Sequence, residues 1–205
     1  MHSLHRRVLL AAAVSASLVL AACGPKGGAV TAEDMSLGNA SAPVTVIEYA
    51  SVSCSHCAAW NKDVWPAFKA KYVDTNQVHY VFREFLTPPV ELAAAGFLLA
   101  RCTGKDKYFG VLDQVFAAQA EIFRTGDIRG PLVAIAGQAG MSEAQFNTCV
   151  SDTKTLNELQ ARVEKYATEA QITGTPTFVV NGTKLDGEQS LAKLDTAIAA
   201  AQAKK

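Results

Sequence analysis

The sequence lacks an excess of charge of either sign. It contains 19 Lys and Arg residues and 19 Asp and Glu residues, which gives a formal net charge of +0 at pH 7. Proteins that bind nucleic acid through its phosphates carry a basic patch or stripe. No such stripe is visible, so we expect no nucleic-acid partner. Internal repeats are absent, and no block of like charges predicts a disordered tail.

The N-terminal apolar run is too short for a permanent membrane anchor. It extends without a charge from Val8 to Ala22, whereas a spanning helix needs about 20 apolar residues. His5, Arg6 and Arg7 precede the run, and small residues end it. This arrangement is typical of a secretory signal peptide. We therefore predict a signal peptide over residues 1–22 and export of the remaining chain.

The segment Leu20-Ala21-Ala22-Cys23 resembles a bacterial lipobox. The resemblance implies that a signal peptidase cleaves before Cys23 after its sulfur has been acylated, which would attach the protein to a membrane. Ordinary signal cleavage nearby, with Cys23 unmodified, is the alternative. Residues 23–34 then read as a flexible tether, because they include a stretch rich in glycine and small residues.

Cysteines are few, and their number is odd, which is unusual for an exported protein. There are 5, and acylation of Cys23 would leave four. Cys54 and Cys57 form a Cys-x-x-Cys pair. In an oxidising compartment, Cys102 and Cys149 can form a structural disulfide, which would stabilise the fold by at most roughly 4 kcal/mol in the chain-entropy model. Two buried free thiols are the alternative.

A second Cys-x-x-Cys or a pair of histidines is missing, so a zinc site at Cys54 and Cys57 would lack its other ligands. We expect no metal and no cofactor, because the cysteines themselves carry the electrons. The pair follows the apolar run 44–50 and begins a helical pattern. Unpaired backbone N–H groups and the macrodipole at a helix start favour a thiolate. We therefore predict Cys54 as the nucleophile and Cys57 as the more buried resolving thiol.

The hydrophobic pattern predicts the order β-α-β, a block of helices, and β-β-α. Strands over residues 44–50 and 78–85 should be parallel, because a helix connects them. Pro66 lies inside that helix and should kink it. Residues 88–170 are helical throughout. Strands over 177–180 and 183–185 then form a hairpin with type I′ turn chemistry at Asn181-Gly182, and a last helix begins near Ser190.

A β-α-β unit bearing Cys-x-x-Cys, followed by Gly174-Thr175-Pro176-Thr177-Phe178, resembles the thioredoxin fold. The helical block between the two halves is similar to that of the DsbA-type thiol–disulfide oxidoreductases. The expected fold class is α/β, with an all-helical insertion over residues 88–170. The insertion separates a first half of the thioredoxin domain, 35–87, from a second half, 171–205. Arg83-Glu84-Phe85 and the spacing of Cys102 and Cys149 resemble a bacterial subgroup with a second disulfide.

The resemblance implies a cis bond between Thr175 and Pro176, opposite the redox pair. The backbone of Thr175 would then pair with that of an extended client segment. Pairing of this kind binds a client with little regard to its sequence. A trans proline opening an edge strand is the alternative. One residue departs from the family, because Ser55 stands where DsbA-type proteins commonly have proline. The residues between the cysteines tune the reduction potential, so the oxidising strength stays open.

Two further residues are candidates for the site. A His56 ring near the Cys54 sulfur would favour the thiolate and so make the protein a stronger oxidant, as is known for DsbA itself; an exposed loop histidine is the alternative. Glu48 falls where many such proteins have a buried acid. Burial should raise its pKa, and it can then relay the proton of Cys57. Equally, it can be a structural residue paired with a lysine.

The sequence thus predicts an exported, lipid-anchored thiol–disulfide oxidoreductase of the bacterial periplasm. It would donate the Cys54–Cys57 disulfide to reduced, unfolded secreted proteins. The resemblance implies reoxidation by a quinone-linked membrane oxidase of the DsbB type, and we expect a monomer. A thiol reductase or isomerase of the same fold, acting for example in cytochrome or copper-site maturation, is the alternative. A second alternative is a holdase without redox function.

Overall fold

A five-stranded sheet forms the centre of the computed structural model, which describes residues 28–204. The predicted signal peptide, Cys23 and the first part of the predicted tether, up to residue 27, lie outside these residues. The strand order is β1-β3-β2-β4-β5, with β2 and β3 parallel and the other neighbours antiparallel. The strands are β1 Met35–Leu37, β2 Val44–Ala50, β3 Val78–Glu84, β4 Thr177–Val180 and β5 Thr183–Asp186.

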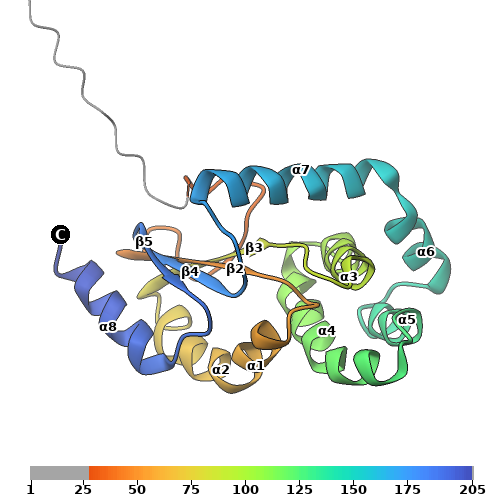
Figure 1. Cartoon of the computed structure of the whole chain (residues 1–205), viewed down its shortest axis with the longest axis horizontal. Helices are drawn as coiled ribbons and strands as arrows, with labels where there is room; N and C mark the ends of the chain where they lie inside the picture. Colours follow the sequence, from red (N-terminus) through yellow and green to blue (C-terminus); the bar gives the residue numbers. More distant parts are fainter. Residues whose placement is uncertain (1–27, 205) are drawn as a thin grey trace, which may run out of the picture.

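Helices cover both faces of this sheet (Figure 1). Helix α7 lies along one face, whereas α1, α2 and α8 lie on the other, and α3 to α6 gather at one side of the sheet. None of the helices within residues 28–204 has the length and apolarity needed to cross a membrane. The helices are α1 Ser55–Asp63, α2 Trp65–Phe68, a π-helix Lys69–Val73, α3 Val90–Cys102, α4 Lys105–Thr125, α5 Arg129–Gln138, α6 Glu143–Ser151, α7 Thr153–Ala170 and α8 Leu191–Gln202.

Strand β2 is buried because both faces of the sheet are covered. Alternate side chains point to opposite faces of a strand, so Val44 and Val46 join the large cluster that includes α1, α2 and α8, while Ile47 and Tyr49 join a smaller cluster beneath α7. The β-α-β, helices, β-β-α order is confirmed. At the hairpin, Asn181 and Gly182 both have positive φ, as type I′ chemistry requires.

The helix expected after Cys54 is divided rather than kinked. Helix α1 ends at Asp63, and Val64 caps it. Helix α2 begins at Trp65, which places Pro66 in its first turn. A proline in this position removes no helical hydrogen bond, because the first N–H groups of a helix have no partner in the helix. Pro66 thus lies in the first turn of a second short helix instead of bending the first.

Five helices, α3 to α7, connect β3 to β4, and a disulfide fixes two of them. It joins Cys102, the last residue of α3, to Cys149 of α6. The predicted bridge is therefore present, and the alternative of two free thiols is wrong. The bridge closes the chain over a sequence separation of 47 residues, so it restricts the unfolded chain considerably.

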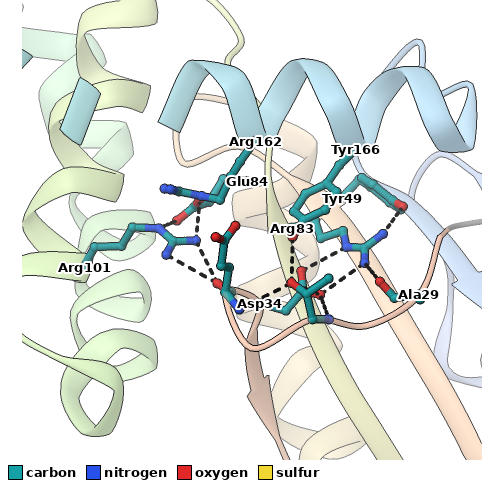
Figure 2. Close-up of polar contacts among 10 residues, drawn as sticks. Ala29, Asp34, Tyr49, Arg83, Glu84, Arg101, Arg162 and Tyr166 are labelled. Carbon is teal, nitrogen blue, oxygen red and sulfur yellow. Dashed lines mark hydrogen bonds and ion pairs between the residues drawn. The ribbon is translucent and has the colours of Figure 1, made fainter. Parts of the chain in front are cut away.

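A buried arginine on β3 holds the N-terminal segment against the sheet (Figure 2). Arg83 Nε and Nη2 donate to the two carboxylate oxygens of Asp34, and Nη2 also donates to the Ala29 carbonyl. The guanidinium lies 4.0 Å from the ring centroid of Tyr166 on α7 and donates to the Tyr49 hydroxyl. The predicted tether over 23–34 therefore extends too far, because Ala29 and Asp34 are fixed by these contacts.

The next residue of β3 ties the helical segment to the sheet. Glu84 accepts hydrogen bonds from the Arg101 guanidinium of α3 and from the Tyr108 hydroxyl of α4. Arg162 of α7 lies 3.6 Å from the same carboxylate. Three helices thus contact one carboxylate at the end of β3.

Candidate active site

Cys54 is the N-cap of α1, the position that the sequence predicts for it. Its backbone is extended, and its Sγ accepts a hydrogen bond of 3.2 Å from the Cys57 amide. This is the geometry in which a cap side chain satisfies an unpaired N–H of the first helical turn. Both redox cysteines are free thiols; Cys54 is partly exposed and Cys57 is fully buried.

The two sulfurs differ strongly in acidity. A hydrogen bond from the Cys57 thiol is the largest cause that lowers the pKa of Cys54, to about 6, against the opposing effect of burial. The Thr175 side chain and the backbone N–H groups of Cys57 and His56 lower it further. Burial first, and then the neighbouring Cys54, raise the pKa of Cys57 well above its ordinary value. At neutral pH the reduced pair therefore carries its negative charge on the exposed sulfur and its proton on the buried one.

The bond between Thr175 and Pro176 is cis, as the resemblance implies. The Thr175 carbonyl oxygen lies 3.5 Å from Cys54 Sγ, so this loop faces the redox pair. Pro176 is buried, and the Thr177 hydroxyl donates to the Gly174 carbonyl at 2.8 Å. The alternative of a trans proline is wrong. Binding of a client strand to the Thr175 backbone stays a prediction.

The residues between the cysteines are exposed. The His56 imidazole has 76% of its side-chain surface exposed, and its Nδ1 lies 3.5 Å from a carboxylate oxygen of Glu188. Its backbone N–H acts on Cys54, whereas the ring is directed to Glu188. Ser55 is the first residue of α1 and is exposed as well. Tuning of the potential by the His56 ring and by Ser55 stays a prediction.

Glu48 is a buried acid on β2, and its partner is a tyrosine. The Tyr80 hydroxyl of β3 donates a hydrogen bond of 2.5 Å to Glu48 Oε2, and both residues are 2% exposed. Burial raises the pKa of Glu48 to about 8, although the Tyr80 hydrogen bond opposes the shift, and the Cys54 charge raises it further. The alternative of a lysine partner is therefore wrong. Glu48 keeps a proton at neutral pH, which is the state that a proton relay for Cys57 requires.

Replacing Glu48 by glutamine should make the protein more stable relative to wild type as the pH rises. The raised pKa means that the folded protein holds a proton, between the ordinary value of 4.5 and about 8, that the unfolded chain has released. The contribution of Glu48 to the free energy of unfolding of the wild type is fully present below that window. It is lost as the pH rises through the window, at about 1.4 kcal/mol per pH unit. The glutamine does not titrate and keeps an acceptor for Tyr80.

Urea unfolding of the oxidised proteins between pH 5 and pH 8 measures this difference, because neither redox cysteine titrates in the disulfide form. The exposed Glu164→Gln variant is the matched control. Parallel stability curves for wild type and Glu48→Gln would show that the carboxyl is not buried as described.

One contact to the redox turn has no signal in the sequence. Gln119 of α4 is 4% exposed, and its amide donates to the carbonyl oxygens of Val52 at 2.7 Å and Cys54 at 3.1 Å. A glutamine within a long helix carries no mark of such a role. Within residues 28–204, no group of three or more His, Cys, Asp or Glu side chains is arranged to hold a metal ion.

An acidic Cys54 at a helix start, a protonated Cys57 beside it and a cis proline facing both define a thiol–disulfide redox site on a thioredoxin fold. The chain belongs to the thioredoxin family, because the family model described as Thioredoxin matches residues 30–200. The DsbA-type architecture, with helices inserted between the two halves of the fold, is confirmed by the similarities that follow.

The protein is similar to a Rickettsia conorii protein provisionally named protein-disulfide oxidoreductase, with 36% identity over 166 residues. The match covers 80% of this chain and 59% of that relative, so the chain spans little more than half of its length. The crystal structure of α-DsbA1 from Wolbachia pipientis has a TM-score of 0.78 and 26% identity, covering 85% of this chain and 94% of that one. Oxidised BdbD from Bacillus subtilis shares the fold, with a TM-score of 0.68, 20% identity, and coverage of 83% and 93%.

Proposed function

We propose that the protein is a protein dithiol oxidase that passes the Cys54–Cys57 disulfide to reduced client proteins. The observation that carries this proposal is the unequal acidity of the two thiols. Stabilising the Cys54 thiolate stabilises the reduced pair, which makes the disulfide easier to reduce and the protein a stronger oxidant. The names of the Rickettsia and Wolbachia proteins support the same chemistry.

The reaction has two exchange steps. A client thiolate attacks Cys54 Sγ, the Cys54–Cys57 bond breaks, and the Cys57 sulfur leaves with the electron pair. Because the pKa of Cys57 is raised, this sulfur takes up a proton, and the protonated Glu48 is the proposed relay. A second client thiolate then attacks the client sulfur of the mixed disulfide and expels Cys54 as a thiolate. Two client thiols have been oxidised to one disulfide, and two electrons reside on the reduced Cys54 and Cys57.

The client would dock as an extended segment beside Thr175, where the cis Pro176 presents the loop to Cys54. His56 and Ser55 would tune the potential from the exposed side. We further propose a periplasmic, lipid-anchored monomer with Cys23 as the lipidated residue, reoxidised by a quinone-linked membrane oxidase of the DsbB type. The N-terminal sequence motifs and the DsbA-type architecture support these proposals.

The equilibrium of the Cys54–Cys57 pair with glutathione at pH 7 tests the direction of electron flow. We expect a potential above about −200 mV, in the range of oxidising enzymes. Absorbance of the reduced protein at 240 nm as a function of pH should give a Cys54 midpoint near the pKa of about 6. A potential near that of thioredoxin, about −270 mV, would mean that the protein is a reductase.

A further inference from the structure

Gln119 links the helical segment to the redox turn. It lies on α4, in the helical segment between the two halves of the thioredoxin fold, yet both of its amide hydrogens are donated to the turn before α1. The acceptors are the carbonyl oxygens of Val52 and Cys54. A buried glutamine with its donors fully used is a fixed group, because leaving a buried donor unpaired is costly.

The two carbonyls that Gln119 binds belong to a turn whose other hydrogen bonds place the Cys54 sulfur. The Cys54 amide donates to the Ser51 carbonyl at 3.0 Å, which closes the turn. The Cys54 carbonyl also accepts the first helical bond of α1, from Ala58 at 3.1 Å. The orientation of this peptide therefore decides whether Cys54 Sγ faces the Cys57 amide, from which it accepts its own hydrogen bond.

We propose that Gln119 is a positioning residue of the redox centre: its amide holds the turn that carries Cys54 so that the sulfur lies against the first amides of α1. This inference rests on the proposed function and deepens it. The Gln119 amide also places its positive end on the Cys54 carbonyl, whose partial negative charge would otherwise oppose a neighbouring thiolate. The helical segment thereby contributes directly to the chemistry of the redox pair.

A purely structural role for Gln119 makes a different prediction. If the side chain only fills space between α1 and α4, its replacement by an apolar residue of similar shape would change the stability of the fold and nothing else. If it positions the turn, the ionisation of Cys54 and the redox equilibrium must change with it. These two quantities can be measured separately from stability in the same protein.

The experiment compares Gln119→Met, Gln119→Glu and wild type, with Gln114→Met as the matched control. Gln114 lies on the same helix, and among residues 28–204 no hydrogen bond joins its side chain to the redox turn. In both Gln119 variants we expect the Cys54 titration midpoint to rise. The equilibrium with glutathione at pH 7 should shift toward the oxidised protein by about fivefold for a rise of one pH unit from a midpoint near 6. The glutamate should have the smaller effect, because burial beside two carbonyl oxygens keeps its carboxyl protonated and leaves it one hydrogen to donate.

The inference is overturned if both Gln119 variants keep the wild-type midpoint and equilibrium, whether or not their melting temperatures fall. It is also overturned if Gln114→Met shifts the midpoint equally, because the effect would then be general to α4. A wild-type protein whose Cys54 ionises like a free cysteine would instead contradict the proposed function. The two failures are therefore distinguishable from the same titrations.

Discussion

Replacing Cys54 by serine is expected to abolish dithiol oxidation while leaving the fold intact. Serine is a good N-cap, and its hydroxyl can accept the hydrogen bond from the Cys57 amide that Cys54 Sγ accepts in the wild type. A hydroxyl cannot form the mixed disulfide, so both exchange steps are lost. Oxidation of a dithiol peptide, followed by its fluorescence, measures activity, and the melting temperature of the same sample reports on the fold.

Two companion variants make this test sharp. Cys57→Ala should accumulate a mixed disulfide when it is mixed with a client that carries a disulfide, because the Cys54 thiolate attacks that bond and no Cys57 thiol is present to release the client. The double variant Cys102→Ala, Cys149→Ala removes the other disulfide and should keep the oxidase activity, since that bridge joins α3 to α6. Full activity in Cys54→Ser would show that the redox pair is incidental and would favour a holdase.

Replacing Arg83 by methionine should lower the free energy of unfolding by about 3–5 kcal/mol. The Arg83 side chain is 0% exposed and the Asp34 side chain is 1% exposed, so water does not replace the lost partner of the carboxylate. The variant also leaves the Ala29 carbonyl and the Tyr49 hydroxyl without this donor, and it removes the cation from the Tyr166 ring. Urea unfolding of the oxidised protein gives the free energy directly.

The surface pair of Arg124 and Glu121 supplies the matched control, because these side chains are 69% and 56% exposed. Arg124→Met should change the stability by less than about 0.5 kcal/mol. Adding Asp34→Asn to Arg83→Met should recover part of the loss, since the amide carries no charge. A loss below about 1 kcal/mol in Arg83→Met would mean that solvent reaches Asp34.

Local features of the sequence were sufficient to predict the redox pair and most of the sheet. An apolar strand that ends before Cys-x-x-Cys, and Asn-Gly between two short strands, are signals carried by neighbouring residues. The identity of buried partners was not predictable in this way. Tyr80 as the partner of Glu48, Asp34 as that of Arg83, and Gln119 at the redox turn each join residues that only the folded chain brings together.

Two further differences have physical reasons. Strand β1, Met35–Leu37, is too short to show an alternating pattern, and pairing with β3 specifies it instead. Pro66 lies in the first turn of a new helix rather than kinking one, because the preceding helix has already ended. His56 shows the limit of motif reasoning, since its position between the cysteines does not determine where its ring points.

Strand β2 sits between β3, which follows it closely in the chain, and β4, whose Val180 pairs with Val46 from near the C-terminus. When the chain emerges with its N-terminus first, the central strand β2 has both neighbours only after β4, almost the last strand, has appeared. Contacts between such distant residues are slow to form. All four cysteines of residues 28–204 emerge earlier than that, so their sulfurs meet solvent, and any oxidant in it, before the sheet is complete.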